Sequence, residues 1–547
     1  MQAAADSKLS RTRLASAEVV DLRFARIAAV AIAAVCVILW LIGWQVRGWI
    51  SAWPRFADDA YYYLVIAGNA AAGHGFTMDR ISPTNGFQPL WMWLLVPIAR
   101  LVGDDANLLL LVVQGICVAI FAAAGGLLCG IVRARIGLVP ALVAGLLLFF
   151  PRIENAALSG MESALALLIL VMLIIEALRS GALSNPEPHA SDARTGVLVG
   201  LLMLARLDFV FVALTLAAWV GLQGLARARA TIAERLLRTA RKGLVVFWPC
   251  LLLVIPYLAW NLLQFGHFVP ISGTLKTSFP VAGFNPRHMN VEHVALLALA
   301  LTGVAVEVRR GARRDPLVEL LAVLSLGLVV HALHAVIYMR WGVLSWHFAG
   351  LIPAGAVGAA LLARAIERRL PRAIVAAGMV GLTVLQILAL AFSISRLGHT
   401  FTIGAREAGE WVAKNLPPDA VIGMKDSGIF SYFAQRRVMN LDGLANSFEF
   451  AEAVCSGRME DFVLEHGVAF ISQHSVPQNV RVGDYETYTQ PYPCGLRGGP
   501  DGELVLRREL EVFRGTPYKN DAGRVEQLVI WRLARAPAGE TAPAARP

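Results

Sequence analysis

The sequence carries little charge for its length. Only 16% of its 547 residues are Asp, Glu, Lys or Arg, whereas 57% are hydrophobic, and this balance excludes an ordinary soluble protein of this size. The net charge is +10, but no basic stripe interleaved with aromatic residues occurs on a polar segment, so we expect no nucleic-acid partner. The apolar residues form long uncharged runs instead, which predict a polytopic α-helical protein embedded in a lipid bilayer.

Cysteine is also scarce, and none of the six residues has the spacing of metal ligands. We expect no bound metal and no cofactor. Four cysteines lie inside apolar runs and are predicted to be small core residues: Cys36, Cys117, Cys129 and Cys250. Cys455 and Cys494 lie in a polar C-terminal segment, and a disulfide between them is compatible with a location outside the cytoplasm. Repeats of solenoid period are absent.

About eleven apolar runs within residues 25–398 are predicted to cross the membrane. The basic tail 1–24 precedes the first run and has no cleavage site after it, so this run is expected to remain as an anchor with the N-terminus in the cytoplasm. With this orientation the strongly basic loops all face the cytoplasm. The runs are Ile27–Val46, Leu108–Val132, Leu138–Pro151, Ser163–Ala177, Val197–Ala205, Phe209–Leu222, Leu244–Leu263, Val291–Val306, Leu317–Ile337, Phe348–Leu362 and Ile374–Ile394.

Two further segments are not predicted to cross. Leu90–Leu101 is apolar but short and contains Pro97, so we expect a helix at the outer interface. Residues 399–535 are polar, with short apolar strands that alternate with helices, which predicts a small α/β domain outside the cytoplasm. Residues 536–547 are rich in Ala and Pro and are expected to be disordered.

The first outer loop, residues 47–107, contains the adjacent carboxylates Asp58 and Asp59 directly after a span. Charge near hydrocarbon is costly and usually functional. Asp58 could cap a helix over 59–72, either residue could act as a general base, and the pair could hold a divalent cation with waters. Adjacent helix residues point about 100° apart, so we expect one carboxylate to face a cavity and the other to brace the loop.

All five predicted outer loops contribute polar or ionisable residues, which predicts a polar cavity that opens outward. These residues are His74, Asn85, Gln88, Glu162, Arg206, Asp208, Lys276, Arg340 and His347. Lys276 could bind a phosphate or only snorkel to the interface. Arg340 and His347, beside two tryptophans, could clamp the same phosphate or belong to an interfacial aromatic belt. Glu162, Arg206 and Asp208 are also compatible with ion pairs between helices.

Several short motifs, in order along most of the chain, resemble those of the GT-C glycosyltransferases and are most similar to the arabinofuranosyltransferase-like enzymes. They are Asp58-Asp59-Ala60-Tyr61, Gly73-His74-Gly75, Thr84-Asn85-Gly86 with Leu90-Trp91, Ser159-Gly160-Met161-Glu162-Ser163, Leu204-Ala205-Arg206-Leu207-Asp208, Val269-Pro270 with Lys276, Lys425-Asp426-Ser427-Gly428 and Leu441-Asp442-Gly443. The segment after Pro270 lacks the Asn and Thr typical of the family, which leaves the transferred sugar and the acceptor open.

The resemblance implies an integral membrane enzyme of the bacterial inner membrane. Such an enzyme moves a sugar, a pentose such as arabinofuranose or a hexose, from a polyprenyl-phosphate donor to a glycan or lipid acceptor, with inversion at the outer face. One aspartate, first Asp58, would be the base, and Lys276, Arg340 and His347 would hold the lipid phosphate. Tyr61 and Trp91 would contact the lipid or the sugar, together with the polar residues of the outer loops.

Two other classes of function remain open from the sequence. A transporter or flippase of a lipid-linked glycan would show internal repeats and broken helices at the middle of the membrane, and the sequence shows neither. A non-catalytic membrane protein with a partner-binding domain would not need charged residues in every outer loop. The glycosyltransferase is therefore the favoured prediction.

Overall fold

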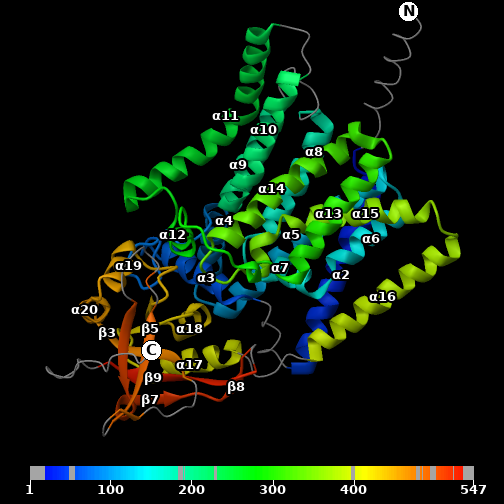
Figure 1. Cartoon of the computed structure of the whole chain (residues 1–547). Coiled ribbons are helices and arrows are strands. Elements are labelled where there is room, and N and C mark those ends of the chain that lie inside the picture. Colours follow the sequence, from blue (N-terminus) through cyan, green and yellow to red (C-terminus); the bar gives the residue numbers. More distant parts are fainter. Residues whose placement is uncertain are drawn as a thin grey trace, which may run out of the picture.

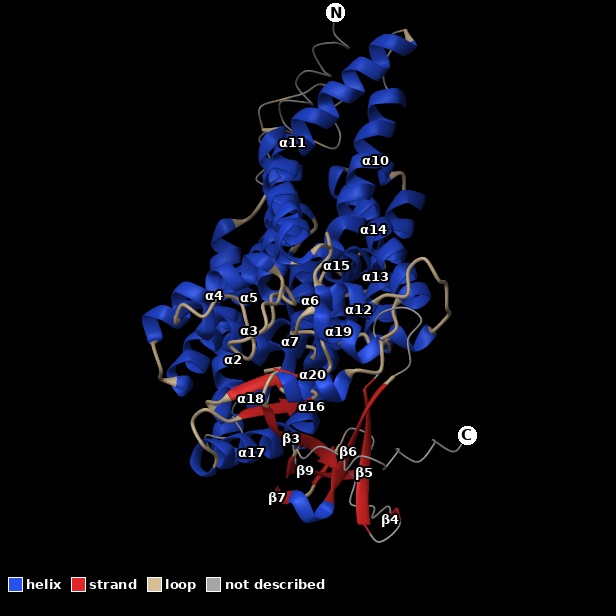
Figure 2. Cartoon of the chain, turned by 90° about the vertical axis from the view of Figure 1, so that its left-hand side faces the viewer, coloured by secondary structure: helices blue, strands red, loops and turns tan. Residues whose placement is uncertain are grey.

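The computed structural model describes residues 19–47, 56–182, 191–226, 231–395 and 401–475, and most of the stretch from 481 to 533. The predicted disordered tail and the first 18 residues of the predicted basic tail lie outside this part of the chain. The described residues form a helical bundle with a sheet-containing C-terminal region, Phe401–Arg532, packed at one end of it (Figures 1 and 2). The chain therefore has the fold of a polytopic helical membrane protein.

Eight helices of the described chain are long and apolar enough to cross a membrane. They are α2 (Leu22–Arg47), α5 (Ala106–Arg135), α8 (Ser163–Ser180), α10 (Val210–Ala226) together with the 3-10 turn η2 (Leu207–Phe209) before it, α11 (Ile232–Phe265), α13 (Val291–Arg309), α14 (Pro316–Tyr338) and α16 (Arg372–Ser395). Each of them coincides with a predicted span. In the bundle, α2 packs along α5, and α10 packs along α14.

The other three predicted spans are helices of fewer than 18 residues. They are α6 (Leu138–Leu148), α9 (Asp192–Ala205) and α15 (Leu351–Glu367). At about 1.5 Å per residue, the 14 residues of α9 cover less than the roughly 30 Å of hydrocarbon. α6 is followed by α7 (Pro151–Leu158) after a bend of 69°, and together they would make a ninth candidate span. Length alone thus supports eight or nine of the eleven predicted crossings in the described chain.

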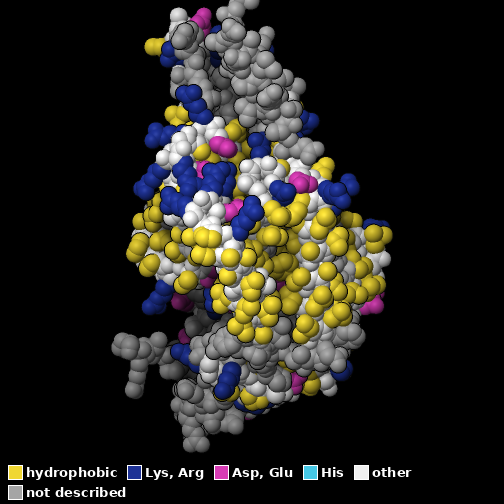
Figure 3. Space-filling view, turned by 90° about the vertical axis from the view of Figure 1, so that its right-hand side faces the viewer, with side chains coloured by type: hydrophobic (Ala, Val, Ile, Leu, Met, Phe, Trp, Pro, Cys, Tyr) yellow, Lys and Arg dark blue, Asp and Glu magenta, His cyan; other side chains and the backbone are white. Residues whose placement is uncertain are grey.

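Apolar side chains cover a broad band of the bundle surface. Figure 3 looks at the side where α16 lies, and Lys and Arg gather along the edge of the band away from the C-terminal region. Only 6% of the apolar window of α16 is buried inside the protein. Its exposed residues include Val380, Leu385 and Leu388. A helix this exposed and this apolar is solvated by lipid.

Three short helices lie between the bundle and the C-terminal region. They are α3 (Asp58–Ala71), α4 (Pro89–Val102) and α12 (Ile271–Lys276). α4 has 14 residues, buries Trp91 and Met92, and is not a candidate span. α3 begins with two aspartates, a favourable place for negative charge because the helix dipole is positive there.

The C-terminal region contains two sheets. The larger has the order β2-β1-β3-β9-β7, with β8 also paired to β9. Its strands β1 (Val421–Met424), β2 (Arg437–Asn440) and β3 (Val468–Ser475) run parallel, and β7 (Glu511–Arg514), β8 (Tyr518–Lys519) and β9 (Val525–Arg532) are antiparallel. The smaller sheet has the order β4-β5-β6, from Arg481–Val482, Tyr485–Tyr492 and Gly502–Arg507.

Helices connect the parallel strands of the larger sheet. α18 (Gly428–Ala434) lies between β1 and β2, and α19 (Phe448–Cys455) and α20 (Met459–Glu465) lie between β2 and β3, while α17 (Phe401–Asn415) precedes β1. α19 and α20 are separate helices, because Gly457 adopts a φ of +71°, a left-handed conformation that ends α19. The strands after β3 were not predicted from the sequence.

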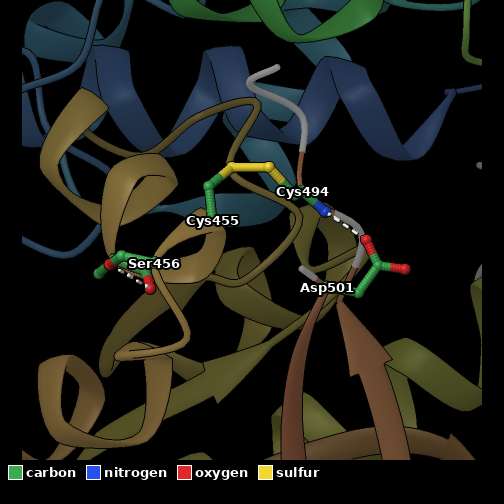
Figure 4. The surroundings of a disulfide bond; sticks show 5 residues. Cys455, Ser456, Cys494 and Asp501 are labelled. Carbon is green, nitrogen blue, oxygen red and sulfur yellow. Dashed lines mark hydrogen bonds between the residues drawn. A yellow bond between two sulfur atoms is a disulfide. The ribbon is translucent and has the colours of Figure 1, made fainter. Parts of the chain in front are cut away.

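Cys455 and Cys494 form a disulfide with a Cα–Cα distance of 4.9 Å, which ties α19 to the segment before β6 (Figure 4). The backbone N–H of Cys494 donates to Asp501 Oδ1 at 2.8 Å. The other four cysteines are buried, as predicted for small core residues, and none of them is in a disulfide.

Candidate functional site

A cavity of about 490 Å³ lies where α3, α12 and the bundle helices meet. Most of its walls are apolar, and its polar groups come from several segments far apart in the sequence. The polar or charged lining residues are Asp59, Tyr62, Tyr63, Gln88, Glu162, Arg206, Asp208, Ser272, Lys276, Thr277, His331, His334 and His347. A cavity that gathers many of the predicted polar residues is therefore present, although most of its wall is apolar, and the C-terminal region contributes Leu444 to that wall.

Asp59 is the aspartate that faces the cavity. Its Oδ2 lies 3.9 Å from Nζ of Lys276, and 26% of its side chain is exposed, so a small molecule in the cavity can reach it. Burial raises the pKa of Asp59 above its ordinary value, and the negative charge of Asp442 adds to this, while Lys276 opposes it. Such a carboxylate is a stronger proton acceptor than an ordinary one when it is ionised.

Asp58 has a different environment from its neighbour and does not line the cavity. Its Oδ2 accepts a hydrogen bond from the backbone N–H of Gly428 at 3.0 Å, and its Oδ1 accepts from Ile429 at 2.8 Å. Asp58 therefore caps α18 of the C-terminal region. The interpretation that it caps its own helix is wrong, because α3 starts at Asp58 with Ala57 as N-cap.

Burial raises the pKa of Asp58 to about 8, although the two N–H donors lower it. Both oxygens are already engaged, and the cavity is on the other side of α3. The prediction that Asp58 is the first choice for the base does not fit this geometry, whereas Asp59 borders the cavity. The expectation that one carboxylate faces the cavity while the other braces the loop agrees with this arrangement.

Deep in the cavity, Arg206 joins two acidic residues. Its guanidinium lies 2.5 Å from Glu162 Oε1 and 2.5 Å from Asp208 Oδ2. Arg206 and Glu162 are nearly fully buried, and His331 Nε2 lies 3.9 Å from Asp208. These residues pair with one another at the start of α8, in the turn after α9 and on α14, so they organise the cavity floor, and all four are among the residues that line it.

Of the three residues predicted to hold a phosphate, two line the cavity and one does not. Lys276 and His347 both line the cavity, and Nδ1 of His347 accepts from the backbone N–H of Leu344 at 3.1 Å. Burial and the charge of Lys276 lower the pKa of His347 well below its ordinary value. Arg340 lies instead in a smaller cavity formed with the loop after α12, and its backbone N–H donates to Lys276 O. The assignment of its side chain to the Lys276 site is therefore not supported.

Other predicted substrate contacts prove to be structural. Trp91 is fully buried and donates from its indole N–H to Gly160 O at 3.1 Å. Asn85 is also fully buried and bridges Asn261 to the start of α12, where Ile271 N donates to it. Tyr61 packs against Tyr432 of α18, 5.4 Å between ring centroids. None of these three residues reaches the cavity, because their side chains fill the packing around it.

Two further predicted residues differ in their position. His74 is exposed and does not border the cavity. Gln88 does line it, and its Oε1 accepts from the backbone N–H of Leu207 at 3.1 Å. Gln88 thereby connects the first loop to the turn that carries Arg206 and Asp208.

The sequence interpretation missed His331 and His334 of α14, which both border the cavity. Two histidines three residues apart inside an apolar span are a usable signal, because ionisable residues at membrane depth usually face a cavity. The structure also contains, among its described residues, no group of three or more His, Cys, Asp or Glu side chains arranged to hold a metal ion.

Comparisons with known proteins place the fold. Residues 396–508 match a family model described as a domain of unknown function (DUF8728). No curated protein matches the sequence. The crystal structure of ArnT from Cupriavidus metallidurans bound to undecaprenyl phosphate is similar in fold, with a TM-score of 0.50 and 14% identity over 81% of this chain and 92% of that one. The same protein in its apo state has a TM-score of 0.49, also with 14% identity.

Proposed function

We propose that the protein is a membrane glycosyltransferase that moves a sugar from a polyprenyl-phosphate donor to a hydroxyl acceptor. The observation that carries this proposal is the pair of Asp59 and Lys276, a base and a cation 3.9 Å apart at the wall of a mostly apolar cavity. The fold adds support, because the similar ArnT structure contains undecaprenyl phosphate. An amphiphilic donor suits a cavity with one polar side and a large apolar wall.

In the proposed reaction, the acceptor oxygen attacks the anomeric carbon of the donor from the face opposite the phosphate. The bond from that carbon to the phosphate oxygen breaks, and the configuration inverts. Asp59 takes the proton of the acceptor hydroxyl, which is ordinary general-base work. The polyprenyl phosphate leaves with the bonding electron pair, and Lys276 stabilises the negative charge on its oxygens.

The rest of the cavity divides between lipid and sugar. The apolar wall, which includes Phe211, Val254 and Leu258, would receive the first isoprenoid units. The carboxylates of Glu162 and Asp208 and the amide of Gln88 would hydrogen-bond sugar hydroxyls. Both a pentose such as arabinofuranose and a hexose fit this description, and a cell-envelope glycan or lipid would be the acceptor.

The orientation follows from charge and from the disulfide. Basic residues gather away from the C-terminal region (Figure 3), and such residues favour the cytoplasmic side. A disulfide in the C-terminal region favours an oxidising compartment. We therefore place the N-terminus in the cytoplasm and the cavity mouth at the outer face of a bacterial inner membrane.

The test is a donor-consumption assay on purified protein in lipid nanodiscs. A panel of polyprenyl-phosphate pentoses and hexoses would be offered with a lipid extract as acceptor, to the wild type, to Asp59→Asn and to Asp105→Asn. Asp105 caps α5 by accepting from Leu108 N, and Asn is an equally good cap. Consumption by the wild type and by Asp105→Asn, but not by Asp59→Asn, is expected. Movement of donor across a vesicle membrane without consumption would contradict the proposal and support a flippase.

A further inference from the structure

The C-terminal region contacts the helix of Asp59 at its first turn. Besides the two hydrogen bonds from α18 to Asp58, the backbones approach so closely that a Cβ added at Gly428 would overlap the carbonyl oxygen of Asp58. Only glycine allows this approach without a shift of one segment. The start of α3 is thus seated directly on the start of α18.

A second contact is centred on the hydroxyl of Tyr62, which is buried between the two parts. It donates to Asp442 Oδ2 at 2.9 Å and accepts from the backbone N–H of Ser427 at 3.0 Å and from Asn440 Nδ2 at 3.2 Å. All three partners belong to the C-terminal region, whereas the ring of Tyr62 lines the cavity. The hydroxyl therefore ties α3, at a position three residues after Asp59, to the ends of β1 and β2.

A third contact holds α12, the helix that ends in Lys276. Leu275 packs with Leu444 and Phe448 in one buried apolar cluster. The imidazole of His267, just before α12, stacks on Phe448 with ring centroids 4.0 Å apart. The segment from Asp426 to Phe448 thus touches both helices that supply the base and the cation (Figure 1).

α3 and α12 are separated by about two hundred residues of sequence, and the 3.9 Å approach of Asp59 to Lys276 depends on how the two helices are held. We propose that residues 426–448 of the C-terminal region are an integral part of the active site. In this proposal Asp58, Asp442 and the hydroxyl of Tyr62 act by positioning: they set the distance between Asp59 and Lys276 and are engaged with one part of the protein or the other rather than with the substrate. The inference rests on the proposed function.

The packing of residues 426–448 against α3 and α12, which we call docking, also sets the electrostatic environment of Asp59. The charged and titratable groups around it are Lys276 of α12, Asp58 and Tyr62 of α3, and Asp426 and Asp442 of the C-terminal region. When residues 426–448 separate from α3, Asp59 gains water, loses the nearby charge of Asp442 and moves away from Lys276. Burial has the largest effect on the pKa of Asp59, so the gain of water outweighs the loss of Lys276 and that pKa falls toward the ordinary value. The acid limb of the pH profile therefore reports docking and is not moved by a mere loss of folded protein.

The experiment uses the full-length protein in nanodiscs with two variants and two matched controls. Tyr62→Phe removes only the central hydroxyl, and Gly428→Ala forces α18 away from α3. Tyr518→Phe removes a buried hydroxyl that bonds His474 inside the C-terminal region, away from the interface. Gly68→Ala adds a Cβ on α3 where nothing lies within 4 Å.

Donor turnover is measured across pH, and hydrogen exchange is measured in residues 58–71, 271–276 and 426–448. We expect both test variants to exchange faster in all three segments, with kcat lowered roughly 10–100-fold because the catalytic groups are misplaced, donor KM nearly unchanged and the acid limb displaced to lower pH. Both controls should match the wild type.

Faster exchange in 426–448 with wild-type kcat and an unmoved acid limb would overturn the proposal. If Gly428→Ala does not fold, the milder Tyr62→Phe decides it. If the wild type consumes no donor, the proposed function fails. The exchange data are read separately: faster exchange of 58–71 and 271–276 in the variants shows that residues 426–448 hold α3 and α12 in place. Wild-type exchange in those two segments shows that they do not.

Discussion

Asp58 and Asp59 are adjacent residues of one type, yet the two faces of α3 give them opposite tasks. Asp58 faces the C-terminal region and is occupied by two backbone N–H groups, whereas Asp59 faces the cavity and approaches Lys276. The helical rotation of about 100° per residue is enough to separate them. Two adjacent aspartates at a membrane face are therefore not equivalent. Packing against the C-terminal region engages Asp58 and leaves Asp59 available for reaction.

The largest expected effect comes from neutralising the cavity-facing member. Asp59→Asn should lower turnover by about 10²–10⁴-fold, since general-base catalysis is lost. The thermal unfolding midpoint should change little, because the side chain of Asp59 is partly exposed and its carboxylate lies 3.9 Å from Lys276, beyond hydrogen-bond distance. Initial rates check the loss of turnover, and a melting curve on the same preparation checks the unfolding midpoint. Retained turnover would remove Asp59 from the reaction.

The next effect concerns the other member. Asp58→Ala should weaken the docking of α18 by about 2 kcal/mol, because two N–H groups lose their acceptor. Asp58→Asn should cost less, since the amide oxygen can still accept one of the two bonds. Hydrogen exchange of residues 428–434 measures the docking. Unchanged exchange in Asp58→Ala would show that the cap does not hold the two parts together.

A smaller effect is expected from the partner of Asp59. Lys276→Met should raise the donor KM by about tenfold, the value of one charge-assisted contact. Lys276 lowers the pKa of Asp59, so its removal raises that pKa further. The ionised base is lost as pH falls through the pKa, and the acid limb of kcat should therefore move to higher pH. A limb that stays in place would show that the two groups do not interact in the working enzyme.

The smallest effect is a pH dependence of docking. The pKa of Asp58 is raised to about 8 in the folded protein, compared with about 3.9 for an ordinary aspartate. The folded state therefore holds a proton that the unfolded chain releases, so the contribution of Asp58 is complete below about pH 4 and is lost as pH rises toward about 8. Exchange in 428–434, corrected for its intrinsic rate, should increase over this window. Asp58→Asn should abolish the trend.

Much of the fold was predictable because its signals are local. Uncharged runs located the helices of the bundle, and the alternation of short apolar strands with helices located β1 to β3 and α17 to α19. The strands from β4 to β9 were not predicted from the sequence. β9 lies against β3 and β7, and the sequence alone does not specify those partners.

The sequence predicted several of the residues that line the cavity, but it did not predict which role each residue has. Asp59, Lys276, Gln88 and His347 do line one cavity, as outward polar residues at the ends of spans suggest. Trp91 and Asn85 were predicted to bind substrate, but both are buried in the packing around the cavity. The sequence does not distinguish a buried aromatic or amide side chain from one that contacts a ligand. The cap that Asp58 makes on α18 joins residues 370 apart, and no local pattern reports such a contact.

The most direct test of the account is the initial rate of donor consumption by Asp58→Asn compared with that by Asp59→Asn, under conditions where both are folded. The account predicts that Asp58→Asn is at least about tenfold faster, because its change acts only through docking. If Asp58→Asn is as inactive as Asp59→Asn while residues 428–434 exchange as in the wild type, Asp58 takes part in the chemistry and the division between the two carboxylates is wrong.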